Sequence, residues 1–336
     1  MSTLNGLSLS TGYGGLDLGL KEVLGDTLEF AALCEIEVFP IANLISKMEH
    51  GLMPIAPIWT NLKTFPYTEF KNKIDLLCAG FPCQPFSMAG PRHGQDSPKH
   101  LWPDIFRGIR ELGTPTLVFL ENVEGIINAN LKKKEGDSPA GTNVTEHIIE
   151  ELARLGYIAT VGAFSASGIG APHRRRRIFF LGVHMSVIDR PEMMEKVAEL
   201  VDGYMDTDFP VVKEVLAAFS QIKDVGAVER EAAKERSKQA KPESWDITDV
   251  ILQHFDFEES RVKQGFPANK SQKPFSWEPP RLIRKDSEGK CDTADSLPDE
   301  LKLLGNGVVP AQASEAFCWL FRQIVHILMH DYEPTL

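Results

Sequence analysis

Short apolar segments alternate with helical patterns along residues 1–185, and this alternation restricts the fold more than any other feature of the chain. The strand-like segments are residues 7–9, 30–33, 74–79, 116–120, 157–165 and 178–183. Between the first two of them, Leu16, Leu20 and Leu24 follow helical spacing. Strands that alternate with helices build α/β domains on a parallel sheet. We therefore predict a doubly wound α/β fold.

The length of 336 residues corresponds to one large domain or two modest ones, at ~150 residues per domain. No apolar run of ~18 residues occurs, and the first residues lack a basic start followed by an apolar stretch, so we expect neither a membrane span nor secretion. The five cysteines are odd in number and form no Cys-x-x-Cys pair, which argues against a disulfide framework or a zinc cluster. We expect a cytoplasmic protein without a metal.

The net charge of −11 is unevenly distributed. Residues 186–260 hold 9 basic against 18 acidic side chains, whereas residues 261–290 hold 8 against 3. Exposed charges act only over a Debye length of ~8 Å at physiological salt, so a local basic patch can bind phosphates on an acidic protein. Nucleic acid therefore remains a candidate partner.

A glycine-rich turn follows the first strand, at residues 10–15, and Glu35 follows the second strand. This arrangement is typical of sites that bind the ribose of a cofactor over the edge of the sheet. The spacing Gly-x-Gly-x-x-Gly is absent, which favours a nucleoside ligand without pyrophosphate. A plain tight turn is the alternative interpretation.

Two chemically active side chains follow neighbouring strands. Cys83 stands between Pro82 and Pro85 after the strand at 74–79, and Glu121 follows the strand at 116–120. Ligands of open α/β sheets gather at the carboxyl ends of the strands, so a thiol nucleophile and an acid are predicted side by side. The alternatives are a small buried thiol and a carboxylate that caps a turn. Residues 88–100 are polar and rich in Gly and Pro, which is typical of a loop that closes over a substrate.

A run of four arginines precedes the last predicted strand, at residues 174–177. In an extended chain, Arg175 and Arg177 share one face and Arg174 and Arg176 share the other. One pair could then face a buried anion or carbonyl group. A solvated basic strand edge is the alternative.

These motifs resemble the cytosine-C5 DNA methyltransferase family. The most diagnostic string is Gly-Phe-Pro-Cys-Gln-Pro-Phe-Ser at 80–87. Four further motifs occur in the same order along the chain as in the family: residues 11–15, residues 121–123, the Arg175-x-Arg177 pair and residues 304–310. The resemblance implies a Rossmann-like S-adenosylmethionine-dependent methyltransferase domain with a smaller target-recognition domain.

The resemblance also implies the catalytic roles. Cys83 would add to C6 of a cytosine flipped out of duplex DNA, and methyl transfer to C5 would follow. Glu121 would protonate or hydrogen-bond N3 of the ring, while Arg177, with Arg175, would hold O2.

S-adenosylmethionine is the implied methyl donor. Glu35 would bind its ribose, Ile36 and Leu62 the faces of the adenine, and Asn61 the adenine edge. The implied cofactor-binding residues are Ser10, Thr11, Gly12, Tyr13, Gly14, Gly15, Glu35, Ile36, Asn61, Leu62, Gly80, Pro82, Leu101, Asn306 and Val308. The expected DNA contacts are Gln84, Ser87, Arg92, Lys99, Arg281 and Arg284.

Three positions depart from the pattern of the family. Ser10 stands where the family usually has Phe, Asn61 where Asp is common, and His173 where Gln is usual. The first two changes predict weaker binding of the cofactor, and none removes a reacting group.

We assign residues 1–185 with 301–336 to the catalytic domain and residues 186–300 to the target-recognition region. Helical spacing at 191–204 and 211–222 predicts amphipathic helices in the acidic segment 186–260. The basic segment 261–290 is predicted to read DNA. We expect a monomer. The segment 186–260 is interpreted first as a structural spacer, and the alternatives are that it packs on the catalytic domain or supports self-association.

Three alternatives remain at this point. The chain could methylate RNA cytosines on the same fold, could bind DNA without catalysis, or, less favoured by its glycine spacing, could be a nicotinamide-dependent oxidoreductase. The sequence does not say which target site is recognised or whether a paired restriction endonuclease exists.

Overall fold

The computed structural model describes residues 3–81, 101–131, 143–171, 175–205, 284–285, 291–292 and 307–330. Its helices and strands are, in chain order, β1 (Leu4–Leu9), α1 (Gly15–Leu24), β2 (Leu28–Cys34), α2 (Val38–Glu49), β3 (Ile58–Trp59), β4 (Leu76–Gly80), α3 (Trp102–Glu111), β5 (Leu117–Val123), α4 (Val144–Arg154), β6 (Tyr157–Ser165), β7 (Arg176–His184), α5 (Pro191–Met205), β8 (Arg284–Lys285), β9 (Cys291–Asp292) and α10 (Pro310–His330). Short 3-10 turns include η2 (Leu62–Thr64), η3 (Tyr67–Phe70) and η7 (Met185–Asp189).

A seven-stranded sheet forms the centre of the molecule, with the strand order β3-β2-β1-β4-β5-β7-β6. The first five strands of this order run parallel, and β7 runs antiparallel to both β5 and β6. The link between β6 and β7, residues 166–175, is shorter than the dozen or so residues that a parallel crossover needs. The predicted doubly wound α/β fold is confirmed, with this one strand reversed.

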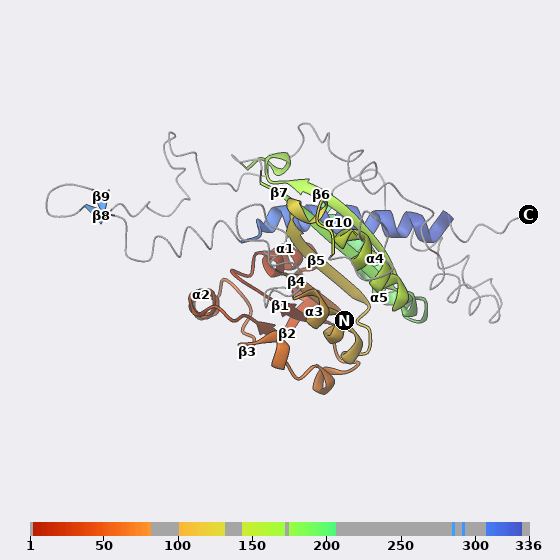
Figure 1. Ribbon diagram of the computed structural model, residues 1–336, viewed down its shortest axis with the longest axis horizontal. Helices are drawn as coiled ribbons and strands as arrows, with labels where there is room; N and C mark the ends of the chain where they lie inside the picture. Colours follow the sequence, from red (N-terminus) through yellow and green to blue (C-terminus); the bar gives the residue numbers. More distant parts are fainter. Residues whose placement is uncertain are drawn as a thin grey trace, which may run out of the picture.

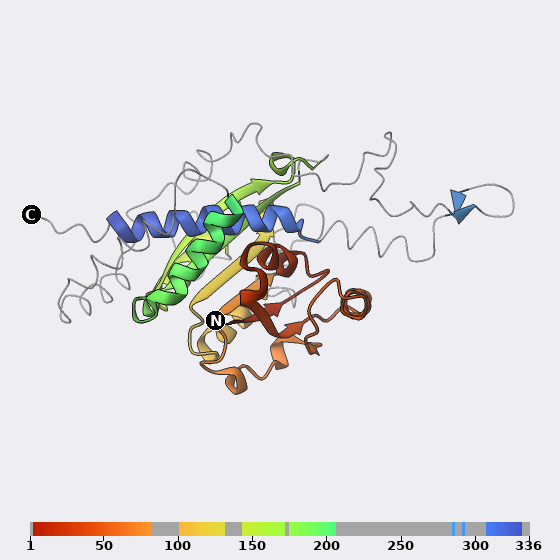
Figure 2. The same ribbon diagram turned by 180° about the vertical axis from the view of Figure 1, so that it is seen from behind.

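Helices cover both faces of the sheet (Figure 1). One face packs against α3 and α4, through side chains such as Ile105 and Ile148. The other packs against α1, α5 and α10, through side chains such as Leu20, Val197 and Phe317. Figure 2 shows α5 and α10 from this second side. The core is therefore two apolar layers separated by the sheet.

Strand β5 is buried along almost its whole length because both faces of the sheet are covered. A strand buried on both faces has apolar residues in succession, so the strand predicted from the apolar run at 116–120 is confirmed. By contrast, α2 buries only Pro40 and Leu44, and Val38 on it is 81% exposed. A helix whose apolar residues face outward lacks a clear amphipathic pattern, so the patterns above did not single it out.

Helix α5 confirms the helical spacing predicted at 191–204. Its buried residues, among them Met194, Val197 and Val201, belong to the same apolar cluster as α1 and α10. This helix lies inside the range 186–300, which was predicted to be the target-recognition region. The helix predicted at 211–222 lies outside the described residues.

None of the helices in the part of the chain that the structure describes is long and apolar enough to cross a membrane.

Candidate active site at the carboxyl edge of the sheet

The glycine-rich turn between β1 and α1 is shaped by left-handed backbone conformations. Gly12 and Gly14 have φ values of 55° and 74°, and Ser10 has a φ of 51°. Glycine adopts this region without steric cost, whereas a serine there is strained. The buried Thr11 closes the turn, because its amide donates to the Cys34 carbonyl at 3.1 Å and its carbonyl accepts from the Gly14 amide at 2.8 Å. The turn is thereby fixed against the end of β2.

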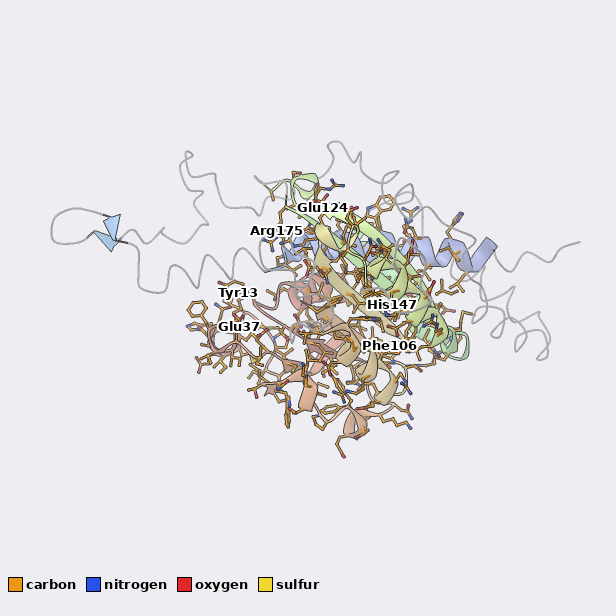
Figure 3. All side chains as sticks on the ribbon, viewed as in Figure 1. Tyr13, Glu37, Phe106, Glu124, His147 and Arg175 are labelled. Atoms are coloured by element: carbon orange, nitrogen blue, oxygen red, sulfur yellow. The ribbon has the colours of Figure 1, made fainter. Side chains whose placement is uncertain are left out.

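Glu35 lies directly beyond β2 and is nearly buried. Its Oε2 accepts the Gly12 amide at 2.7 Å, and its Oε1 accepts the amides of Ile36 and Glu37, both at 2.8 Å. Figure 3 labels Tyr13 and Glu37, which follow Gly12 and Ile36 in the chain, at the same side of the molecule. A carboxylate has about four acceptor positions, so Glu35 is oriented by three backbone donors and keeps capacity for a further hydroxyl group.

The residues predicted for the adenine lie beside Glu35. Ile36 is 66% exposed and offers an apolar surface, and Leu62 is nearly buried. Asn61 begins η2, where its Oδ1 accepts the amide of Lys63 at 3.0 Å. The side-chain oxygen that would meet the adenine edge therefore already accepts one hydrogen bond as a cap. Exposed large apolar side chains of the described residues all lie between positions 36 and 59.

Gly80, at the end of β4, joins the cofactor side of the site to the acid. A Cβ at this position would lie 3.8 Å from the Ser10 carbonyl oxygen, 3.9 Å from Val308 Cγ2 and 3.6 Å from Glu121 Oε2. Val308 also approaches Gly15 so closely that a Cβ there would lie 2.2 Å from the Val308 carbonyl oxygen. Residues from the two ends of the chain thus meet at one point.

Glu121 faces Gly80 across the β4–β5 pair and is almost completely buried. Its Oε1 lies 3.0 Å from Nε of Arg177 on β7. Burial raises the pKa of Glu121 to about 7, and the charges of Arg177 and Arg175 offset this effect only in part. Near neutral pH this carboxyl group can therefore carry or release a proton, as a general acid requires.

The arginines alternate as an extended strand requires. Arg175 and Arg177 both act electrostatically on Glu121, whereas Arg176 forms an ion pair with Glu124 at 2.8 Å. Figure 3 shows Arg175 and Glu124 in the same region of the molecule. Burial lowers the pKa of Arg175 to about 10, which still leaves the guanidinium charged at neutral pH. Arg175 also donates to the Gly307 carbonyl, just before α10.

Two residues that the sequence analysis did not assign support this cluster. Gln312 of α10 is buried, and its Nε2 donates to the carbonyl groups of Phe164 at 2.6 Å and Arg175 at 3.1 Å. Asn122 donates from Nδ2 to the Phe81 carbonyl at 3.2 Å. The motif at 121–123 contains Asn122 and could have drawn attention to it. Gln312 carries no such signal, because its partners are distant in sequence.

Phe81 belongs to the motif at 80–87 and is the last described residue before Cys83. Besides its bond from Asn122, its ring packs against Trp102, with centroids 6.1 Å apart. Trp102 is held in turn by Glu151, since its Nε1 donates to Oε2 at 2.5 Å. The chain is therefore anchored next to Glu121, two residues before Cys83.

Burial raises the pKa of the thiols of Cys34, to about 12, and of Cys78. A thiol reacts as a nucleophile in its thiolate form, so neither of these cysteines is suited to that role. The residues that the structure describes also contain no group of three or more His, Cys, Asp or Glu that could hold a metal ion.

Several predicted site residues lie outside the described residues: Pro82, Cys83, Gln84, Ser87, Arg92, Lys99, Arg281 and Asn306. Arg284 lies in β8, which pairs with β9. Leu101 is the N-cap residue of α3 and is half-buried.

The strand order, the glycine turn and the acid at the edge of β5 define a Rossmann-like methyltransferase domain. The model of the C-5 cytosine-specific DNA methylase family matches residues 4–298, and the chain belongs to this family.

Known proteins similar to this chain include two bacterial type II methyltransferases. M.MspI of Moraxella sp is 31% identical over 205 residues, which are 59% of this chain and 44% of that protein. M.NgoBV of Neisseria gonorrhoeae is 28% identical over 260 residues, which are 74% of this chain and 57% of that protein. The chain thus spans about half the length of these relatives. A solved structure of a Spodoptera frugiperda DNMT2 mutant, 16% identical, has a TM-score of 0.50 and covers 96% of this chain and 100% of that one, which agrees with the fold.

Proposed function

We propose that this protein is a DNA (cytosine-5)-methyltransferase that uses S-adenosylmethionine as methyl donor. The observation that carries the proposal is the buried Glu121 beside Arg177 and Gly80, with a pKa raised to about 7. An acid of this kind is what N3 of cytosine requires during attack on the ring.

The residues present fit S-adenosylmethionine. Glu35 is oriented by three backbone amides and can accept a ribose hydroxyl, and the exposed Ile36 offers an apolar face to the adenine. Gly12 leaves open space where a side chain would otherwise stand. S-adenosylmethionine, when bound, supplies an electrophilic sulfonium methyl group. The strained Ser10 and the capping role of Asn61 support the expectation of weaker binding than the usual residues would give.

We infer the following roles for the protein's own groups. The Cys83 thiolate forms a bond to C6, and the electrons of the C5–C6 double bond move toward C5 as Glu121 gives its proton to N3. Arg177, aided by Arg175, stabilises the negative charge that develops at O2. After C5 has gained the methyl group, a base takes the C5 proton, the electrons of the C5–H bond re-form the C5–C6 double bond as the C6–S bond breaks, and N3 returns its proton to Glu121. This last step restores the aromatic ring and the thiolate.

Cytosine must leave the duplex to reach these groups. Residues 88–100 are proposed to close behind the flipped base, with Arg92 and Lys99 on phosphates and with Gln84 and Ser87 near the base. The basic segment 261–290, including Arg281 and Arg284, is proposed to read the target sequence. The partner is therefore double-stranded DNA.

The packing of α5 in the core supports a later boundary for the recognition region than residue 186. We propose that residues 186–205 belong structurally to the catalytic domain and that target recognition begins beyond Met205. A paired restriction endonuclease is a further hypothesis, suggested by the type II names of the relatives.

The test is transfer of labelled methyl from S-adenosylmethionine to unmethylated duplex DNA by the purified protein, with structured tRNA as a second acceptor. Label at cytosine C5 within a short DNA motif, absent for Cys83→Ser, is the expected result. Label on tRNA alone would show that the substrate is RNA and not DNA. Duplex binding without label on either acceptor would indicate a DNA-binding relative without catalysis.

A further inference from the structure

Helix α3 is connected to two parts of the expected cofactor site. Leu101, an implied cofactor-binding residue, is its N-cap, and Arg107 on the same helix reaches the segment that holds Leu62, one of the two expected adenine faces. We propose that Arg107 and Tyr67 are positioning residues that set the affinity for S-adenosylmethionine by fixing residues 61–63. This inference rests on the proposed function.

Tyr67 is fully buried and contacts this segment. Its hydroxyl donates to the Leu62 carbonyl at 3.2 Å. Its ring packs directly on α3 at Gly108, where a Cβ would lie 2.8 Å from two of the ring carbons. A side chain at position 108 would therefore force Tyr67 away from α3 and move its hydroxyl relative to Leu62.

Arg107 holds the same segment from the side. Its Nη2 donates to the Lys63 carbonyl at 3.0 Å and lies 3.5 Å from the Leu62 carbonyl oxygen. The guanidinium stands over the Tyr67 ring, 5.1 Å from the centroid, and Nη1 pairs with Glu111 at 3.1 Å. A planar guanidinium can donate from Nη2 to this segment and from Nη1 to Glu111 at the same time, which a single ammonium group cannot do equally well.

The segment so fixed carries the adenine-facing groups. Asn61 is constrained by its bond from the Lys63 amide, and Thr64 donates from its hydroxyl to the Asn61 carbonyl at 3.2 Å. A binding wall that is already ordered loses less entropy when the ligand binds, so its affinity is higher. The reacting groups Glu121 and Arg177 lie on β5 and β7, and Arg107 is not among their contacts in the described residues. Loss of the clamp should therefore affect binding more than chemistry.

The experiment measures the Kd for S-adenosylmethionine by calorimetry, together with kcat, KM and Tm, on the full chain. Arg107→Gln removes the charge and the planar fork, and Arg107→Lys is the conservative rescue. Arg110→Gln is the matched control, since it makes the same change at an exposed position of the same helix. Tyr67→Phe removes only the hydroxyl group.

We expect Arg107→Gln to raise Kd and KM about tenfold at nearly unchanged kcat and Tm, because charged hydrogen bonds to two carbonyl groups are lost. Arg107→Lys should recover part of the affinity, Tyr67→Phe should weaken binding by a smaller factor, and Arg110→Gln should match wild type. If Arg107→Gln binds S-adenosylmethionine as tightly as wild type does, the positioning role is refuted, whereas the proposed function still stands. A fall in Tm and kcat without a change in Kd would also refute it. A wild-type protein that does not bind S-adenosylmethionine would overturn the proposed function as well.

Discussion

Replacing Gly19 with alanine would insert a methyl group into the contact between α1 and α10. In the native structure, a Cβ at this position would lie 2.5 Å from the Pro310 carbonyl oxygen and 2.8 Å from Ala313 Cβ. Real Cβ atoms essentially never approach another atom below 3.0 Å, so the start of α10 must move away from α1. The segment just before α10 includes Gly307, whose carbonyl group accepts a hydrogen bond from Arg175.

The expected loss of stability follows from two opposing effects. Overpacking of a closed contact costs up to about 3 kcal/mol, since one of the clashing atoms belongs to the backbone. Alanine in place of a helical glycine raises the free energy of unfolding by about 1 kcal/mol through its higher helix propensity. The net change is a loss of up to about 2 kcal/mol in the free energy of unfolding, or up to about 3 °C in Tm for a chain of this size.

Urea unfolding monitored by circular dichroism measures this change directly. Gly203→Ala is the matched control, because Gly203 also lies in a helix, α5, but a Cβ there meets no atom within 4 Å. It should gain about 1 kcal/mol from helix propensity alone. If Gly19→Ala proved as stable as Gly203→Ala, the close approach of α1 and α10 at this glycine would be disproved.

Two further predictions concern buried carboxyl groups. Burial raises the pKa of Asp17 to about 6 from 3.8, so this residue favours the folded state at low pH and loses that contribution as the pH rises through 6. Asp17→Asn should therefore be more stable than wild type at pH 8, by up to about 3 kcal/mol, and gain little at pH 4; equal gains at both values in urea unfolding would contradict this. For Glu121, whose pKa is raised to about 7, the protonated fraction falls as the pH rises, so the ratio of methyl-transfer rates of wild type to Glu121→Gln should decrease from pH 6 to pH 8. That ratio should be roughly a hundredfold or more at pH 6, and a ratio independent of pH would show that Glu121 does not act as an acid.

Six strands of the central sheet were predictable because each contains a compact apolar segment: β1, β2, β4, β5, β6 and β7. The two-residue strands β3, β8 and β9 were not predicted. The range 157–165 coincides with β6, and 178–183 lies inside β7. The pairing direction of β7 was not predicted, since a sequence pattern marks a strand but not its neighbour. The helices α3, α4 and α10 were not singled out either, although they supply much of both apolar layers.

The positions of Cys83 and Glu121, each just after a predicted strand, predicted that the two side chains lie near each other. The reason is that neighbouring parallel strands have their carboxyl ends at the same edge of the sheet. The alternation of side chains along a strand likewise predicted that Arg175 and Arg177 share a face. These conclusions needed only local geometry and the fold class. The roles of Cys83 and of the DNA-contacting residues remain predictions.

Only the tertiary structure decided how these groups affect one another. The register of β4 and β5 sets Gly80 against Glu121, and β7 pairs with β5 on its other side and brings Arg177 to this acid, whose burial raises its pKa. The approach of Val308 to Gly15 joins segments almost three hundred positions apart. The sequence alone determined which chemical groups are available and on which strands they stand. Their protonation and mutual distance came from long-range packing, which no local pattern encodes.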